Sequence, residues 1–267
     1  MRDEKALRVD ELDSDLFLFR GEAYDSGSLA VLAGDRVLLI DGLASVRDAR
    51  ALQRTLVQEW GKRVELLVST HYFSDHMAAW NLFPEAPLLA HVNSIQTFWS
   101  EEFRTAEEAR HFRPPTIRLS GRLELSWGRF RIEVFESPGH TADAMHVDIP
   151  DADLIHVGDA AVGRLAYLHY SAPEPIDRAL EGALARGRAR VLRSHGPVAG
   201  PDALRSARGY LRRLEKRVRA ARQGGEPIGD IPVADCLPAG EPATDFEAFF
   251  HGRNLASIEA RGLFAEA

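Results

Sequence analysis

Apolar and polar positions alternate with the spacing of β-strands at the start of the chain. Short runs rich in Leu, Val and Phe occupy residues 16–20, 29–33 and 36–41, and the dipeptide Gly34-Asp35 joins the last two. Such a dipeptide between two apolar runs is a strong hairpin signal, because its residues tolerate the backbone angles of a tight turn. The chain is therefore predicted to open as an antiparallel sheet.

The spacing becomes helical at residues 45–60, which read SVRDARALQRTLVQEW. Apolar side chains recur there every three or four positions, and Ser45 and Asp48 have the spacing of a capping box. The same two periodicities predict the elements that follow. They are a strand at 63–69, a short helix at 77–82, a strand at 86–91, a helical segment at 93–110, and strands in TIRLS, RLELSW, FRIEVFE, MHVDI and ADLIHVGD.

Helical spacing returns near the C-terminus. Residues 201–223 place apolar side chains on one face and arginines on the other, and Thr244 and Glu247 give a second capping-box pattern at the start of a last helix. We interpret the arginine-rich face as solvated surface that covers apolar atoms, rather than as a contact for RNA or an acidic partner. Three aromatic residues of the last helix are expected to belong to the core: Phe246, Phe249 and Phe250.

The order of these elements predicts an α/β fold. Strands, a helix, more strands and then helices follow one another without a repeat or a linker. This order favours a single domain, residues 1–267, in which two β-sheets pack face to face and helices cover the outer faces. The helical part at 201–267 is expected to cover the mouth of a pocket.

Composition narrows the class of protein. The chain has 267 residues, 45% of them hydrophobic, and the single Cys236 excludes both an internal disulfide and a cysteine-rich zinc site. The charged N-terminus lacks the apolar core of a signal peptide, and no stretch has the length of a membrane span, so a cytoplasmic protein is expected. The net charge of −7 argues against nucleic acid or a membrane surface as a partner.

Histidines and aspartates gather in loops that follow predicted strands. Residues 69–76 read STHYFSDH, and SPGHT, LIHVGD and SHG follow later in the chain. Strand ends can hold ligands from distant segments at one point. Imidazole and carboxylate together suit zinc, iron or manganese better than calcium or magnesium. The sequence therefore predicts a transition-metal site formed by His71, Asp75, His76, His140, Asp159 and His195.

The order HxxxDH, GHT, GD and SHG resembles the signature of the metallo-β-lactamase fold superfamily, in which HxHxDH precedes the separated single ligands. The resemblance covers roughly residues 10–200. It implies an αββα sandwich, in agreement with the layering expected from the spacing. It also implies that Asp41, which follows the hairpin, supports the loop that carries the ligands.

The resemblance assigns the ligands to two metal ions. His71, the residue at position 73 and His140 would bind the first ion, and Asp159 would bridge the two. The second ion would be bound by Asp75, His76 and His195. Position 73 is Phe, whose ring has no lone pair for a metal, so the first ion keeps only three of these ligands. One or two ions, most consistent with zinc, are expected, and ligand counting places a single ion with Asp75, His76, Asp159 and His195.

Other polar and aromatic side chains are weighed as further donors or as substrate contacts. Candidates to replace the missing ligand are Tyr72, His91 and the cluster Tyr167, His169 and Tyr170. Substrate contacts are expected from Tyr72, Phe73, Tyr167, His169 and Tyr170. His146 and His156, each inside a predicted strand, are interpreted as hydrogen-bonded residues of the sheet.

These residues favour a metal-dependent hydrolase of a small-molecule ester, lactone, thioester or amide. A metal-bound hydroxide would attack the carbonyl, and Asp75 would orient the water or accept its proton. A non-haem iron oxidoreductase and a non-catalytic member of the same fold are the alternatives, because the ligands do not separate zinc from iron or manganese. The partner is expected to be a small molecule, with a homodimer left open.

Overall fold

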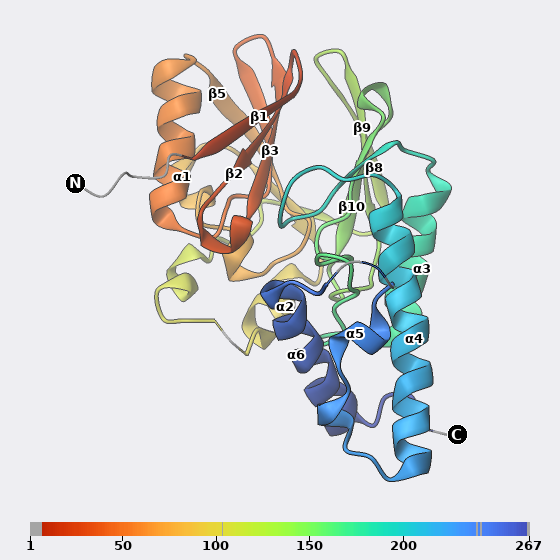
Figure 1. Ribbon diagram of the computed structural model, residues 1–267. Coiled ribbons are helices and arrows are strands. Elements are labelled where there is room, and N and C mark those ends of the chain that lie inside the picture. The colour runs from red at the N-terminus through yellow and green to blue at the C-terminus, as the bar shows by residue number, and fades with distance from the viewer. Residues whose placement is uncertain (1–6, 103, 239, 241, 266–267) are drawn as a thin grey trace, which may run out of the picture.

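The computed structural model describes residues 7–102, 104–238, 240 and 242–265. Within them the strands form two sheets that face each other, and helices cover the outer faces (Figure 1). The predicted αββα sandwich is confirmed. None of the helices in this part of the chain combines the length and the apolar character needed to cross a lipid bilayer.

The first sheet contains seven strands within the described residues, in the order β1 to β7. They are β1 (Arg8–Asp13), β2 (Leu16–Arg20), β3 (Gly27–Ala33), β4 (Arg36–Ile40), β5 (Arg63–Val68), β6 (Leu88–His91) and β7 (Ile117–Leu119). Neighbouring strands are antiparallel from β1 to β4 and parallel from β4 to β7. The predicted hairpin is confirmed: Ala33 pairs with Arg36 across the turn, where Gly34 has a φ of 68°.

The second sheet contains five strands within the same residues, in the order β12-β11-β10-β9-β8. They are β8 (Arg122–Trp127), β9 (Phe130–Glu136), β10 (Met145–Ile149), β11 (Leu154–His156) and β12 (Arg190–Leu192). Strands β8 to β11 are antiparallel, and β12 joins β11 in parallel. Both sheets are therefore mixed.

The helices form the outer layers. They are α1 (Val46–Gln53), α2 (Ser94–Ser100), α3 (Pro173–Ala185), α4 (Asp202–Gly224), α5 (Val233–Cys236) and α6 (Asp245–Arg261). Helix α1, which continues as a π-helical turn at Arg54–Glu59, lies on the outer side of the first sheet, and α3 and α4 lie on the outer side of the second (Figure 1). Helices α5 and α6 pack beside α4 beyond the end of the sandwich.

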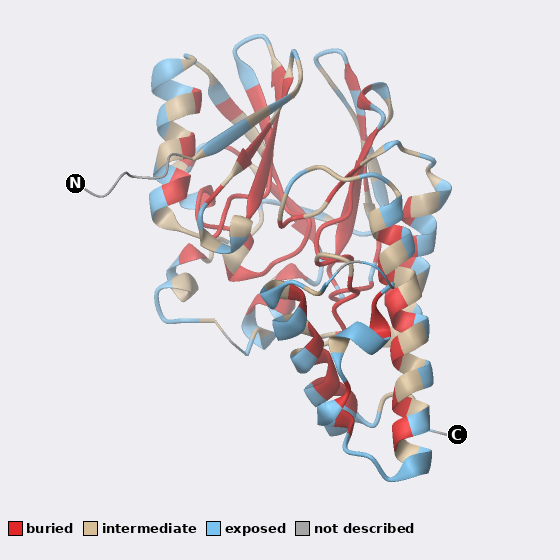
Figure 2. Cartoon of the chain, in the orientation of Figure 1, coloured by how far each residue is buried: buried red, intermediate tan, exposed pale blue. Residues whose placement is uncertain are grey.

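The core between the sheets follows from the alternation of side chains along the strands. Leu38 and Ile40 of β4 face the other sheet, where they join Ile132 and Val147, while Leu39 faces α1. Strand β4 is thus buried on both faces, which explains its uninterrupted apolar sequence. Figure 2 shows the buried residues concentrated between the sheets and along the inner faces of the helices.

Two of the predicted helices are shorter in the structure. The segment 77–82 forms only a 3-10 turn at Trp80–Leu82, and the segment 93–110 forms α2 and a second 3-10 turn at Glu108–His111. The guanidinium of Arg113 donates to the carbonyls of Trp80 and Phe83, and that of Arg104 donates to the carbonyl of Phe98. These guanidinium groups add hydrogen bonds to carbonyls at or next to the short helical segments.

Helix α3 was not predicted, although its sequence contains a start signal. Pro173 occupies the first turn, where a missing N–H costs nothing, and Ile176, Ala179, Leu180 and Ala183 form its buried face.

At the start of α1 the predicted capping box is only half formed. The Ser45 hydroxyl accepts the N–H of Asp48, whose carboxylate accepts the N–H of Glu22 instead.

The interpretation of the sheet histidines is wrong for His146. Neither ring nitrogen of His146 has a hydrogen-bond partner among the described residues, and burial lowers its pKa to about 3. His156 is hydrogen-bonded on one side only, where its Nδ1 accepts the N–H of Gly158. Its Nε2 lies 3.9 Å from the carboxylate of Asp41. A neutral imidazole inside a sheet is therefore tolerated here without full hydrogen bonding.

Helix α6 is anchored by the predicted capping box. The Thr244 hydroxyl accepts the N–H of Glu247, and the Glu247 carboxylate accepts the N–H of Thr244. The same carboxylate accepts the backbone N–H of Arg164 and two bonds from its guanidinium. Burial acts to raise the pKa of Glu247, but the bonds from Arg164 and Thr244 outweigh it and lower the pKa to about 2.

We expect the Glu247→Gln variant to lose stability in a pH-dependent way. The pKa of Glu247 falls from 4.5 to about 2 on folding. The ionised carboxylate therefore stabilises the fold above pH 4.5, and this stabilisation is lost as the pH drops toward 2. Because solvent screens the pair with Arg164, we expect the variant to lose about 2 kcal/mol of unfolding free energy at pH 7. The loss should shrink to less than about half of that at pH 3.

Urea unfolding at the two pH values measures this difference. The exposed Glu259, on the same helix, provides the control: Glu259→Gln should change the free energy of unfolding by less than about 0.5 kcal/mol. A Glu247→Gln variant with wild-type stability at pH 7 would refute the anchoring role.

Candidate metal centre

The six predicted ligands lie in loops at one end of the sandwich. His71, Asp75 and His76 follow β5, His140 stands between β9 and β10, and the other two follow β11 and β12; these are Asp159 and His195. Four separate segments of the chain therefore meet at one point, as expected for side chains carried by strand ends.

The side chains form two groups of three. One ligand atom from each of His71, His140 and Asp159 lies within 4.8 Å of the others, and the same holds for Asp75, His76 and His195. Asp159 lies between the groups: its Oδ2 is 3.9 Å from Nε2 of His71 and 3.3 Å from Nε2 of His195. We call these groups the first triad and the second triad.

The free lone pairs of the triads fit a metal ion. Nε2 of His71, His76 and His140 and Oδ1 of Asp159 are buried and have no hydrogen-bond partner among the described residues. Leaving such atoms unpaired is costly, and a divalent cation that accepts their lone pairs removes the cost. Imidazole nitrogens with carboxylate oxygens are donors that zinc accepts.

Hydrogen bonds on the far side of the imidazoles orient them toward the centre. Nδ1 of His195 donates to the carbonyl of Tyr24 at 2.9 Å, and Nδ1 of His140 donates to the carbonyl of Tyr167 at 3.5 Å. Because a carbonyl only accepts, the neutral ring keeps its proton on Nδ1 and its lone pair on Nε2. Both Nε2 atoms therefore present a lone pair to the centre.

The charges of the site also suit a cation. Burial works against the charge of Asp159, yet the neighbouring His195 and His76 hold its pKa well below the usual range. Burial likewise opposes a proton on His76, but Asp75 and Asp159 raise the pKa of His76 to about 10. The carboxylates thus stabilise a positive charge at the centre, and a metal ion would take the place of that proton.

Asp41 fixes the loops that carry these residues. Its carboxylate accepts the N–H of Thr70 at 2.8 Å and the Thr70 hydroxyl at 2.7 Å, and the Ser194 hydroxyl lies 3.5 Å away. Thr70 precedes His71, and Ser194 precedes His195, so one buried carboxylate holds a ligand loop from each sheet. Burial raises the pKa of Asp41 to about 6.

A cavity of about 510 Å³ opens in front of the triads. Asp75, His140, Asp159 and His195 form its floor. Its walls are aromatic: Tyr24, Phe73, Tyr167, Tyr170, Phe246, Phe249 and Phe250. The centre is therefore open to solvent through a cavity with a largely aromatic lining, to which Glu101, Glu108, Asp245 and Arg253 add charged side chains.

Comparison with known proteins identifies the family. The family model described as the metallo-beta-lactamase superfamily matches residues 24–220. The chain belongs to this superfamily. Among curated relatives, a hydroxyacylglutathione hydrolase from Brucella ovis is 26% identical over 153 residues, which are 55% of this chain and 51% of that hydrolase. The chain thus aligns with about half the length of the curated relatives it matches.

Solved structures share the superfamily fold. A metallo-beta-lactamase from Pontibacter korlensis gives a TM-score of 0.65 at 19% identity and covers 77% of this chain and 99% of its own. A stereoselective inverting sec-alkylsulfatase from Pseudomonas sp. gives a TM-score of 0.72 at 13% identity and covers 97% of this chain and 51% of its own. At these identities the likeness concerns the fold.

Phe73 stands where the superfamily signature has a histidine. Its side chain is buried, and its ring centroid lies 5.2 Å from that of His71, 5.4 Å from that of His140 and 4.6 Å from that of Tyr170. The ring thus closes one side of the first triad with carbon atoms. The second triad has a more distant aromatic neighbour, Phe246, whose ring centroid lies 6.2 Å from that of His195.

Tyr72 and His91, two candidates to replace the missing ligand, lie away from the two triads. Tyr72 is fully buried under the first sheet against Trp80, and its hydroxyl donates to the carbonyl of Arg113. Its proposed roles as donor and as substrate contact are wrong, because its side chain points to the opposite side of the loop from its neighbour His71. His91 lies 3.4 Å from Glu136 instead of reaching a triad.

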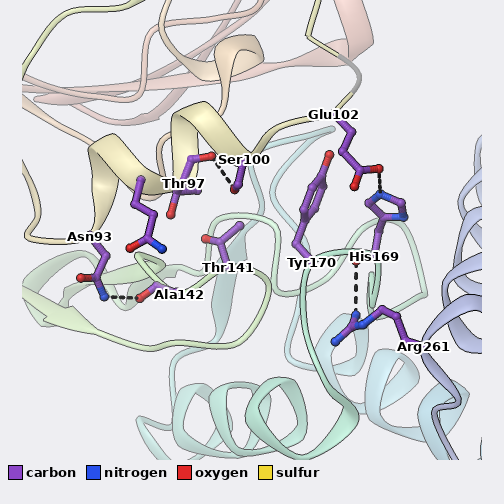
Figure 3. Close-up of a pocket in the computed structure, with 10 residues that line it drawn as sticks. Asn93, Thr97, Ser100, Glu102, Thr141, Ala142, His169, Tyr170 and Arg261 are labelled. Atoms are coloured by element: carbon purple, nitrogen blue, oxygen red, sulfur yellow. Dashed lines mark hydrogen bonds and ion pairs between the residues drawn. The ribbon is translucent and has the colours of Figure 1, made fainter.

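His169 lines a second cavity, which lies on the other side of Tyr170. This cavity has a volume of about 370 Å³ and a polar wall that includes Asn93, Thr97 and Arg261 (Figure 3). Nε2 of His169 lies 3.3 Å from the carboxylate of Glu102. The prediction that His169 contacts a substrate at the metal centre is therefore wrong, whereas Tyr167 and Tyr170 do line the cavity above it.

The assignment to the core is wrong for Phe246 and Phe249 and holds only in part for Phe250. All three line the cavity, and Phe249 is 56% exposed; only Phe250 packs against the core as well. Together with Arg253, they occupy one face of α6 at spacings of three, four and seven residues. The spacing marks them as one face, but only the packed structure shows that this face meets the metal centre.

We expect Asp41→Ala to weaken zinc binding and the fold together. Removal of the carboxylate leaves the buried Thr70 N–H unpaired, which costs about 2–3 kcal/mol of unfolding free energy. It also frees the loop before His71, so zinc affinity, measured by competition with a chelating dye, should fall about 10–100-fold. The isosteric Asp41→Asn keeps an acceptor for Thr70 and should lose less. Wild-type zinc affinity in Asp41→Ala would contradict the role assigned to Asp41.

Proposed function

We propose that this protein is a metal-dependent hydrolase of small molecules that contain an ester, lactone, thioester or amide carbonyl. The observation that carries the proposal is the convergence of unpaired, buried imidazole and carboxylate atoms on the floor of a cavity open to solvent. Membership of the metallo-beta-lactamase superfamily and similarity to hydroxyacylglutathione hydrolases support it.

The two triads would hold the metal, which we propose to be zinc. His71 and His140 with Asp159 would bind one ion, and Asp75, His76 and His195 would bind the other. A bound zinc ion supplies Lewis acidity, which lowers the pKa of water and polarises a carbonyl group. Asp159 belongs to the first triad, but its Oδ2 also lies 3.3 Å from Nε2 of His195, so its carboxylate would be available to a metal held by either triad.

Phe73 makes the two triads unequal. The first triad has three donors and a phenyl ring beside them, whereas the second gains a fourth donor from Asp159, whose Oδ2 lies 3.7 Å from Nε2 of His76. The atoms of the second triad also lie close together, with Asp75 oxygens 3.3 Å from His76 and 3.5 Å from His195. We therefore propose that the second triad with Asp159 binds its ion more tightly.

Asp75 is the residue best placed to handle the proton of the reaction. Its carboxylate lies between the imidazoles of His76 and His195 and lines the open cavity. In hydrolysis the oxygen of a water molecule bonds to the carbonyl carbon while the bond to the leaving group breaks. Asp75 would orient this water, accept its proton at a carboxylate oxygen and pass the proton to the leaving oxygen, sulfur or nitrogen.

Elemental analysis together with ester, lactone and thioester assays tests this function. We expect about one zinc ion per chain for the wild type, nearer two for Phe73→His, which restores a donor, and less than one for Asp75→Ala. Hydrolysis by Asp75→Ala should fall at least about 100-fold. His169→Ala, which alters a histidine outside both triads, is the control for metal content and should match the wild type.

Two results would overturn the proposal. A chain that folds without stoichiometric metal and hydrolyses no carbonyl substrate would be a non-catalytic member of the superfamily. Bound iron together with oxygen consumption would instead indicate the oxidoreductase alternative.

A further inference from the structure

Aromatic side chains line much of the cavity above its polar floor. Phe73 contacts Tyr170 with ring centroids 4.6 Å apart, and Phe250 of α6 contacts Phe246 at 4.7 Å and Phe249 at 5.3 Å. These five rings, which we call the aromatic wall, line a single cavity. An apolar surface left open in this way is typical of a binding site for an apolar group.

Carboxylates surround the same cavity. Glu101, Glu108 and Asp245 line it in addition to the aspartates of the metal centre. Glu101 is held by the N–H and hydroxyl of Ser74, at 3.1 and 2.8 Å. Because they lie outside the triads, these three charges are not neutralised by ligation.

Arg253 is the single cationic side chain among the described residues that line the cavity. Its guanidinium lies 4.7 Å from the centroid of the Phe249 ring and donates to the Tyr167 hydroxyl at 3.3 Å. One guanidinium is outnumbered by three carboxylates, so the side chains outside the metal centre contribute a negative potential at the mouth of the cavity when all three are ionised. Such a potential repels an anionic group and raises the cost of binding it.

We infer that the substrate presents an apolar group without negative charge to the aromatic wall, and that substrates with an anionic group at this position are rejected. The inference rests on the proposed hydrolytic function and specifies the class of substrate. It also gives Phe73 a role, because the ring that replaces a ligand brings the wall to within 5.4 Å of the His140 ring and 5.2 Å of the His71 ring. An apolar group can therefore remain in contact with carbon up to the reacting centre.

A matched series of p-nitrophenyl esters tests this selectivity at pH 8, above the pKa of about 7 to which burial raises Glu101. The acyl groups are butanoyl, octanoyl, and an octanoyl chain whose last carbon is a carboxylate. We expect octanoyl to exceed butanoyl at least about tenfold in kcat/KM, because its additional methylenes are buried on the wall. The anionic chain should be at least about tenfold worse than octanoyl.

Variants separate the wall from the charges. Phe249→Ala should reduce the preference for octanoyl, whereas Trp99→Ala, which removes an aromatic side chain that is 59% exposed and outside the cavity, should leave it unchanged. The double variant Glu108→Gln and Asp245→Asn should relieve the rejection of the anionic chain. A preference for the anionic chain that disappears in Arg253→Gln would overturn the inference while leaving the hydrolytic function intact.

Saturation-transfer NMR gives a readout that needs no turnover. We expect the wild-type protein to bind the ketone 2-octanone, Phe249→Ala to bind it more weakly, and the matching keto acid with a terminal carboxylate to bind less well than the ketone. Binding of the ketone without hydrolysis of any ester, lactone or thioester would overturn the proposed function alone. Absence of ketone binding would overturn the inferred substrate class.

Discussion

The hydrogen bonds that Asp41 accepts are the constraint on which the metal centre depends. The residue directly follows β4 of the first sheet. Its carboxylate holds Thr70 in the loop after β5 and lies beside Ser194 in the loop after β12 of the second sheet. The N–H of Met145 donates to the carbonyl of Thr70 at 2.7 Å, which ties the loop before β10 to the same point. These bonds hold loops from the two sheets together. They are needed because gathering buried, unpaired ligand atoms at one point is energetically unfavourable.

Most of the fold and the six triad residues could be predicted because their signals are local. A dipeptide such as Gly34-Asp35 favours a hairpin, and the Thr244 and Glu247 pair favours a helix start, through interactions between near neighbours in the sequence. The six candidate ligands can be recognised from their places after predicted strands and from the order of their motifs, since strand ends place side chains at a shared edge. The positions of the Tyr72 and Phe249 side chains depend instead on which way a loop turns and on which surface α6 covers. Those choices are made by tertiary packing.

Phe73 links the chemistry of the centre to its proposed choice of substrate. A histidine at this position would add a donor to the first triad, whereas the phenyl ring withholds one and adds carbon surface between His71, His140 and Tyr170. In the proposed function, Phe73 would therefore weaken the first triad as a metal site and extend the aromatic wall toward the reacting carbonyl. The fold tolerates the exchange because the ring is buried among other aromatic side chains, where it replaces a polar group with a favourable apolar contact.

The position of the bound metal is the most direct test of the unequal metal affinity proposed for the two triads. Crystals grown with about one equivalent of zinc and measured on both sides of the zinc absorption edge show each ion as an anomalous peak. We predict the stronger peak among Asp75, His76, Asp159 and His195, and a weak peak or none beside His71 and His140. Peaks of equal height at both triads, or a single peak beside His71 and His140, would contradict the unequal roles assigned to the triads.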